Sequence, residues 1–301
     1  MNKLTTFVLT ASLLALTPAA AFADSDSSKS AKTEQATPGL EAALNSSDAQ
    51  QEKKTQTAPD NLAAIKARAA EAIAKRQRDL GSWSAKVSSQ TTDCGQNASS
   101  LSRIGLTQAG LTVLGTSIAA AATPEIAKPL YQQIFTHQRV YLVVSPVVHV
   151  SLACDKQWAR GTKQTTSIAE LTTKIAAAKA KGVNTAAAEA FLAQVAPVIA
   201  TGKATAAAAS GSLTGLAPDQ GNEATKTANA AAVDAAKAQI KLADASFDKA
   251  ADLLKQTAKA LGTQAKSEKA EKKAEHEAEK AEKKAEHEAA KAARTKGKSD
   301  K

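Results

Sequence analysis

Apolar residues recur along much of the chain at three- and four-residue steps, the spacing that gathers them on one face of an α-helix. Lysines and arginines between these positions fall largely on the opposite face. The first such stretch follows Pro59, and its inner face is formed by Leu62, Ile65, Ala69, Ile73, Arg76, Leu80, Trp83 and Val87. The pattern predicts one long amphipathic helix.

A second helix is expected after a polar break at residues 91–97. Its heptad positions Ile104, Leu111 and Ile118 alternate with Thr107, Leu114 and Ala121. A turn at residues 123–125 leads into a third element, which we expect to run as one helix from Pro124 past Trp158 to Gly182. Pro146 lies inside this element and is expected to kink the helix rather than end it.

The apolar run from Val140 to Ala153 is the ambiguous part of the third element. Its β-branched residues also fit a strand, and its hydropathy also fits a membrane-inserting hairpin. Arg139 and Asp155 bound the run at a length short of the ~20 residues that a membrane span needs. A buried helix is therefore the preferred interpretation.

Two more helices are expected downstream. The fourth follows Asn184 and Thr185, with Pro197 as a weak point and a looser stretch at residues 202–221, and its apolar side is formed by Phe191, Leu192, Val195, Val198 and Ile199. The fifth has the most regular register, which persists to Gly262: Val233, Ile240, Phe247, Leu254 and Leu261 lie seven apart, and Ala236, Ala243 and Ala250 follow three later. Such a stripe requires a partner helix, in this chain or in a second copy, so a homodimer stays open.

The composition narrows the fold class. Aromatic residues make up only 3% of the chain, and alanine dominates its apolar fraction. Alanine is the best helix former and lets helices approach closely, which favours slim helices over a thick globule. We therefore predict an all-α fold, an elongated antiparallel, coiled-coil-like bundle of about five long helices over residues 59–262.

Residues 263–301 form a charged segment with an internal repeat of eleven residues, Ala270 to Lys280 and then Ala281 to Lys291. Its alanines recur at about 3.67 residues, close to the helical period, and glutamates precede lysines by four residues at Glu268 and Glu279. This pattern predicts a solvated, semi-rigid helical extension.

The N-terminal residues indicate export. Lys3 supplies a positive charge, an apolar run follows from Leu4 to Leu16, and Ala21-Phe22-Ala23 has the small residues of a cleavage site. We expect a signal peptide at residues 1–23, cleaved after Ala23, and a secreted or envelope-associated mature protein. Residues 24–58 are polar with only scattered leucines, which predicts a disordered spacer.

The only two cysteines, Cys94 and Cys154, predict one disulfide, because the compartment outside the membrane permits oxidation. Two free buried thiols are the alternative. If the second and third helices pack antiparallel, a rise of about 1.5 Å per residue brings the third level with Asn97 near residue 150. Cys94 then lies beside Cys154, so the helix layout supports the same pairing.

No local motif indicates catalysis or a cofactor. The chain lacks the Gly-x-Ser-x-Gly, His-Glu-x-x-His and Cys-x-x-Cys patterns and any glycine-rich phosphate loop. His276 and His287 lie eleven residues apart, about 16 Å along a helix, too far to share one metal ion. His149, within an apolar run, is interpreted as a buried structural histidine. We therefore expect a protein that is not an enzyme and holds no metal.

The net charge of +10 suggests anionic partners outside the cell membrane. The basic C-terminus could contact an anionic envelope polymer or a lipid surface, although a solvated tail is preferred, and its cations are Lys291, Arg294, Lys296, Lys298 and Lys301. Nucleic acid is not expected, because aromatic stacking platforms are absent and glutamates interrupt the basic residues of the repeat.

The stretch from Ile134 to Pro146, with its Arg139-Val140-Tyr141 core, resembles a segment found in an uncharacterised family of exported, alanine-rich helical proteins of Gram-positive bacteria. The likeness covers roughly residues 59–261, and Gln138 stands where the family has an aromatic residue. The resemblance implies long helices and an envelope location, and it carries over no functional residue.

These observations together predict an exported, non-enzymatic helical protein that acts as a structural or interaction module of the cell envelope. The expected partner is an envelope protein of unknown identity or an anionic polymer. The alternative is a binder of anionic polymers or membrane surfaces that acts through the basic C-terminus.

Overall fold

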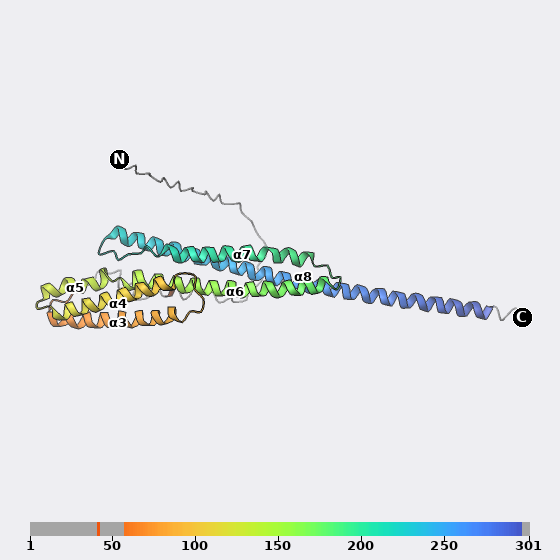
Figure 1. The fold of residues 1–301 in the computed structure, drawn as a ribbon, viewed down its shortest axis with the longest axis horizontal. Coiled ribbons are helices and arrows are strands. Elements are labelled where there is room, and N and C mark those ends of the chain that lie inside the picture. Colours follow the sequence, from red (N-terminus) through yellow and green to blue (C-terminus); the bar gives the residue numbers. More distant parts are fainter. Residues whose placement is uncertain (1–40, 43–56, 297–301) are drawn as a thin grey trace, which may run out of the picture. The chain divides into compact units, whose positions relative to one another are not determined.

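A computed structural model of the chain describes residues 41–42 and 57–296. All of these belong to one compact unit, Gln35–Lys301 (Figure 1). The predicted signal peptide, most of the predicted spacer and Lys298 and Lys301 lie outside the described residues. The regular secondary structure of the described part is entirely helical, which confirms the all-α fold.

The described helices are five long ones and one short one, with a π-helical turn between two of them. The short helix is α5 and the π-helical turn is η1. In chain order the elements are α3 (Leu62–Ser88), α4 (Asn97–Ala120), α5 (Pro124–Thr136), η1 (Val140–Val144), α6 (Ser145–Lys179), α7 (Ala186–Ser212) and α8 (Glu223–Lys296).

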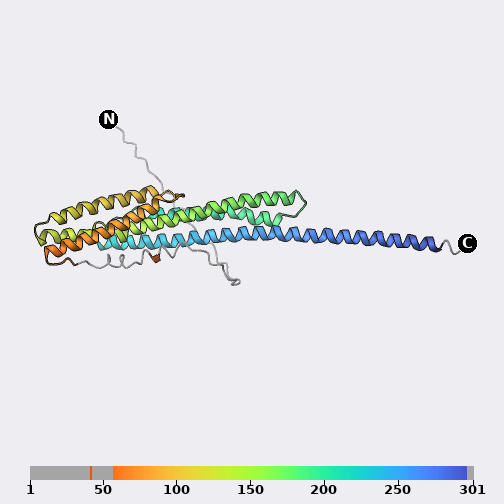
Figure 2. The same ribbon diagram turned by 90° about the horizontal axis from the view of Figure 1, so that it is seen from below.

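The helices form two groups (Figure 2). Each group surrounds one cluster of buried apolar side chains. In the first, α3 packs against α4 and α5, around residues such as Ile65, Leu111 and Ile134. In the second, α6, α7 and α8 pack against one another around Val195, Ile240 and Phe247. Residues of η1 and early α6 contribute to both clusters, so this segment joins the two groups.

The predicted stripes of α3 and α4 are confirmed, and that of α8 is confirmed as far as Ala250, after which Leu253 and Thr257 are buried in place of the predicted Leu254 and Leu261. Ile104, Leu111 and Ile118 are almost fully buried on α4, and the first-helix stripe is buried on α3. On α8 the buried residues continue at heptad spacing and include Val233, Ala236, Ile240, Ala243, Phe247 and Ala250. The partner that this stripe requires is supplied within the chain by α6 and α7.

The prediction of one continuous helix from Pro124 to Gly182 is wrong. The chain leaves the helix after Thr136, and Arg139 has a left-handed backbone with φ of 37°. It re-enters through η1, where the Ser145 amide donates to the Val140 carbonyl. The helical backbone continues from η1 into α6 without a break, since Val144 and Ser145 both have right-handed helical geometry. The interruption of the helix therefore lies at Arg139, and not at Pro146.

The expected looser stretch at residues 202–221 is helical in its first half. α7 continues through Pro197 to Ser212, and Gly202, Ala206 and Ala209 on it are buried. Their small side chains allow α7 to pack closely against α8, which outweighs the low helix propensity of glycine. Only residues 213–222 form the connection between the two helices.

Two glycines make room for the largest buried side chain of the second cluster. A Cβ at Gly161 on α6 would lie 2.9 Å from Cε1 of Phe247, and one at Gly202 on α7 would lie 3.0 Å from Cε2 and Cζ of the same ring. The Phe247 ring therefore sits between the backbones of α6 and α7. The ring fits there because neither Gly161 nor Gly202 has a Cβ atom.

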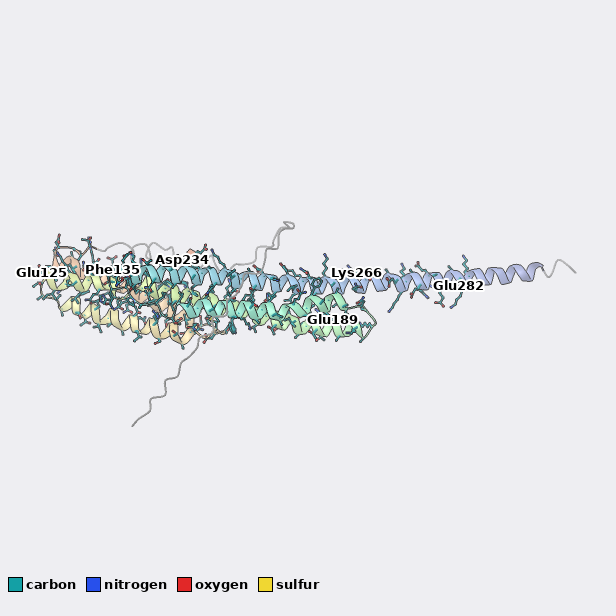
Figure 3. The ribbon with its side chains drawn as sticks, turned by 90° about the horizontal axis from the view of Figure 1, so that it is seen from above. Glu125, Phe135, Glu189, Asp234, Lys266 and Glu282 are labelled. Carbon is teal, nitrogen blue, oxygen red and sulfur yellow. A yellow bond between two sulfur atoms is a disulfide. The ribbon has the colours of Figure 1, made fainter. Side chains whose placement is uncertain are left out.

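Helix α8 does not end at Gly262 but continues through the charged repeat to Lys296. Burial stops near Leu261, and the side chains from Lys269 to Lys284 are exposed. Figure 3 shows Lys266 and Glu282 on this part of α8. Lys283 lies 2.5 Å from Glu279, which is one of the expected four-residue ion pairs.

Candidate functional site at the α5–η1 junction

The chain is conformationally unusual between α5 and α6. Arg139 and Gln220 are the only described residues other than glycine with positive φ, at 37° and 50°. They lie on neighbouring segments, since the Gln220 amide donates to the Thr136 carbonyl at 3.2 Å. Strained backbones and π-helical turns are enriched at functional sites, so this junction is the first place to look for one.

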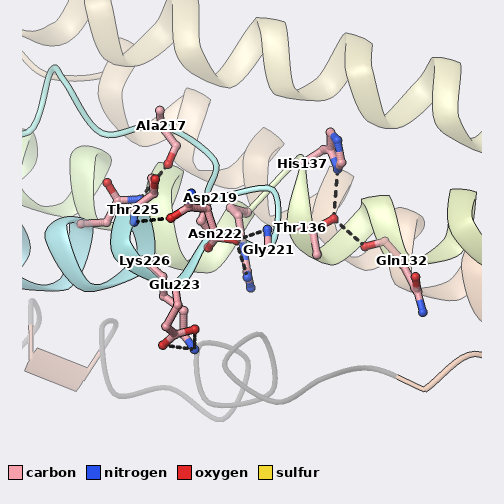
Figure 4. A network of polar contacts seen from close by, with 12 residues as sticks. Gln132, Thr136, His137, Ala217, Asp219, Gly221, Asn222, Glu223, Thr225 and Lys226 are labelled. Atoms are coloured by element: carbon pink, nitrogen blue, oxygen red, sulfur yellow. Dashed lines mark hydrogen bonds and ion pairs between the residues drawn. The ribbon is translucent and has the colours of Figure 1, made fainter.

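A buried ion pair holds the junction to the loop before α8. Nη2 of Arg139 donates to Oδ1 of Asp219 at 2.9 Å, and the two side chains are only 8% and 3% exposed. The same carboxylate oxygen accepts the Gly221 amide at 2.8 Å (Figure 4). Charge pairing and backbone donors together stabilise a loop that the hydrophobic pattern does not specify.

A cavity of about 410 Å³ lies on the α4 side of the junction, between α4, η1 and the loop before α8. We call it the Arg103 cavity. Its walls include Ser99, Ser102, Arg103, His137, Val143 and Pro218. Leu106 and Val144 add apolar surface, so the cavity combines a few polar groups with an apolar wall, as small-molecule sites do.

Arg103 is the only charged residue of α4. Its Nη1 donates to the Leu216 carbonyl at 2.6 Å and its Nη2 to the Thr214 carbonyl at 2.8 Å. These carbonyls fix the guanidinium but do not neutralise it, and no carboxylate in the described part of the chain pairs with it. Burial lowers the pKa of the Arg103 guanidinium from its ordinary value.

His137, on the opposite wall, contacts its neighbour Thr136. The Thr136 hydroxyl donates to the Gln132 carbonyl at 3.1 Å and lies 3.0 Å from Nδ1 of His137 (Figure 4). The tautomer of His137 sets which of the two groups donates in the second contact.

Gln138 lies between this wall and α4. Its amide group packs against Gly110, where an added Cβ would come within 2.7 Å of Nε2 of Gln138. A larger residue at 110 would displace this side chain, which also lines the cavity.

A second cavity, of about 250 Å³, opens on the other side of the junction between η1 and the first turns of α8. Tyr141, Leu142 and Val233 form its apolar wall. Lys226 and Lys237 stand at its rim, but each is already paired, with Glu223 at 3.2 Å and with Asp234 at 3.0 Å. The lysine charges at the rim of this second cavity are therefore neutralised by neighbouring carboxylates, whereas, among the described residues, the charge of Arg103 is not.

The predicted disulfide between Cys94 and Cys154 is present, with their Cα atoms 6.0 Å apart. The adjacent Asp155 is 1% exposed, and its Oδ1 accepts the Cys94 amide at 2.9 Å. Burial raises the pKa of the Asp155 carboxyl, and the Cys94 amide opposes this effect. Asp93 lies nearby, but the sulfur of Cys94 is in the disulfide and Asp93 caps α4, so the cluster is explained without a metal.

His149 is a partly buried histidine, as predicted. Its ring lies edge-on to Trp83 with ring centroids 5.8 Å apart. Desolvation lowers the pKa of His149 to about 4, and the charge of Lys86 adds to this effect. The neutral ring packs as an apolar group at ordinary pH.

The predicted polyanion-binding residues are not brought into the junction. Lys291, Arg294 and Lys296 fall on the last turns of α8, where the side chains are outside the described set, and Lys298 and Lys301 lie beyond the described residues. The sequence analysis missed Arg103. A single charge in the 24 residues of α4 was the available signal.

Comparisons with protein-family models, curated proteins and solved structures find no match to this chain. No described helix combines the length and hydropathy needed to cross a membrane.

Proposed function

We propose that the protein is an exported, non-enzymatic interaction module of the cell envelope. The observation that supports this most is the two-part character of α8. Its first half is a core element of the bundle, and its second half continues as a charged helix with exposed side chains. A continuous helix transmits the position of the bundle to the exposed repeat, which suits a protein that holds a partner at a distance.

The disulfide and the signal sequence support the envelope location. A covalent link between Cys94 and Cys154 is the arrangement favoured in oxidising compartments. N-terminal sequencing of the protein purified from its native cells is expected to begin at Asp24. Recovery of the intact chain, starting at Met1, from the cytoplasm alone would contradict the proposal.

Site-specific photo-crosslinking tests the interaction role. A crosslinking amino acid at Lys273 or Glu277, both exposed on the second half of α8, is expected to capture an envelope component in intact cells. Arg78, exposed on α3, is the matched control position. Equal capture from Arg78 and Lys273, or none from any α8 position, would count against α8 as the interacting element.

Binding of anionic envelope polymers through the basic C-terminus is the second candidate, favoured by the exposed lysines that precede it, such as Lys280 and Lys284. Contacts of this kind weaken steeply with salt. Replacing the five basic residues from Lys291 to Lys301 with glutamine should remove salt-sensitive binding to a purified anionic wall polymer. Unchanged binding after this replacement would eliminate the second candidate.

The resemblance of the Ile134 to Pro146 segment to exported Gram-positive proteins supports the same proposal. In this chain the segment builds the α5–η1 junction and joins the two apolar clusters. Its role in the fold is sufficient reason for its sequence, so the segment itself is not proposed as the partner-binding surface.

A further inference from the structure

We propose that the Arg103 cavity binds a small organic anion, with the anionic group at Arg103 and the apolar part of the ligand against Leu106 and Pro218. This inference goes beyond the proposed envelope role and does not depend on it. The ligand class follows from the charge, the size and the wall chemistry of the cavity.

The charge is the first argument. Arg103 is half-buried, and the carbonyls of Thr214 and Leu216 hold its guanidinium in place without neutralising it. Those two contacts use two of its five N–H donors. By contrast, the buried Arg139 nearby is paired with Asp219 at 2.9 Å. A fixed, partly desolvated cation that pairs with no carboxylate of the described residues favours an anion more strongly than a lysine in bulk water does.

The walls supply further donors on both sides of the guanidinium. Ser102 precedes Arg103 on α4, and Ser99 lies one turn earlier, so both hydroxyls face the same cavity. His137 faces them from the junction and adds a polar ring to the wall. No acidic residue of the described part of the chain lines the cavity.

The size and the apolar wall select an organic anion over an inorganic ion. A volume of about 410 Å³ far exceeds that of a single phosphate and falls in the range of small-molecule sites. Leu106, which is 74% exposed, and Pro218 provide an apolar surface beside the charge. An anionic group on a short apolar body would satisfy both features.

The test uses two fluorescent probes with one ring system, anilinonaphthalene sulfonate and the uncharged phenylnaphthylamine. The full mature chain should bind the sulfonate about tenfold more tightly than the neutral probe, since one desolvated charge contact is worth roughly that factor. Hexanoate and hexyl phosphate, added as competitors, distinguish a carboxylate from a phosphate as the preferred anionic group. Equal affinity for the charged and neutral probes would overturn the proposal.

Variants of α4 locate the binding. Ser102→Glu places a negative charge in the cavity at an exposed position and should weaken sulfonate binding about tenfold. Thr116→Glu is the matched control, because it adds the same charge on the same face of α4 about 21 Å away, beyond the screening length. Equal effects of the two variants would refute binding in this cavity.

Arg103→Gln removes the charge while keeping an amide donor for the loop carbonyls, and Arg78→Gln is its control. The expected result is loss of sulfonate binding with unchanged binding of the neutral probe and unchanged helicity by circular dichroism. If Arg103→Gln unfolds the loop, Ser102→Glu still decides the question. Retained sulfonate binding in a folded Arg103→Gln protein would overturn the proposal.

Discussion

Buried polar side chains at the residue scale connect segments that are distant in sequence. Asp155 on α6 accepts the amide of Cys94 from the α3–α4 loop, and Gln164 donates to the Phe247 carbonyl on α8 at 2.7 Å. Arg76, buried on α3, lies over the Phe135 ring at 4.6 Å from its centroid. Such contacts fix which faces of the alanine-rich helices meet, because alanine alone specifies register weakly.

Asp155 offers a test of this view. Asp155→Asn keeps an acceptor for the Cys94 amide and removes a buried charge, so it should change the free energy of unfolding at neutral pH by less than about 1 kcal/mol. Asp155→Ala leaves that amide without its partner and should cost about 1–3 kcal/mol. Urea denaturation at pH 7 compares the two. A larger loss for asparagine than for alanine would contradict this account.

His149 should make stability depend on pH. Its folded pKa of about 4 lies below the ordinary 6.5, so the unfolded chain takes up a proton first. The stability that the neutral His149 ring contributes is fully present above pH 6.5. It is lost as the pH drops toward 4, which lowers the free energy of unfolding by up to about 3 kcal/mol. Urea denaturation from pH 7 to pH 4.5 should show a smaller loss for His149→Phe than for the unmodified protein. Parallel curves for both would refute this assignment.

The sequence predicts much of the structure at the element scale, because heptad stripes on α3, α4 and α8 leave only one face to bury. It fails at the break after Thr136, because residues 137–139 contain no proline or glycine that would mark the break. Arg139 at this break pairs with Asp219, which is 80 residues away in the sequence. The Arg103 cavity was missed for the same reason, since its walls come from three separate segments.

The pair of glycines around Phe247 gives a prediction for the second cluster. Gly202→Ala adds a Cβ against the ring and against Ser246, neither of which can move freely, and should cost about 1–3 kcal/mol. Gly211→Ala, with no atom within 4 Å of the added Cβ, is the control on the same helix and should be neutral or slightly stabilising. Thermal unfolding measures both. Equal effects would mean that the close approach of α7 to α8 is not limiting.

The junction gives a second prediction at this scale. Asp219→Ala leaves the buried Arg139 without its carboxylate and should cost about 3–5 kcal/mol. Asp234→Ala, which breaks an exposed pair with Lys237, is the control and should cost less than about 1 kcal/mol. Denaturant titration of both variants checks the contrast. Similar losses would show that burial does not strengthen the Arg139 pair.

The disulfide acts at the scale of the whole molecule, because it closes a loop with a sequence separation of 60 residues. Removing it with the double substitution Cys94→Ala and Cys154→Ala should lower the free energy of unfolding by about 4 kcal/mol at most. The fold should survive, since the two apolar clusters remain. Reductant should destabilise the unmodified protein by a similar amount and leave the double variant unchanged. Insensitivity of the unmodified protein to reductant would contradict the prediction.

Because α8 is uninterrupted, it also fixes how far the charged repeat is rotated about the helix axis relative to the buried stripe. Successive residues turn by about 100° around a helix axis, so Ala270, nine residues after Leu261, lies about 180° from it. Ala274 and Ala278 lie about 140° and 100° from Leu261, so the alanine row occupies a different side of α8 from the buried stripe. A helix that packed on this row would contact α8 on that other side, and inserting two residues after Gly262 would rotate the row by about 200° without disturbing the core.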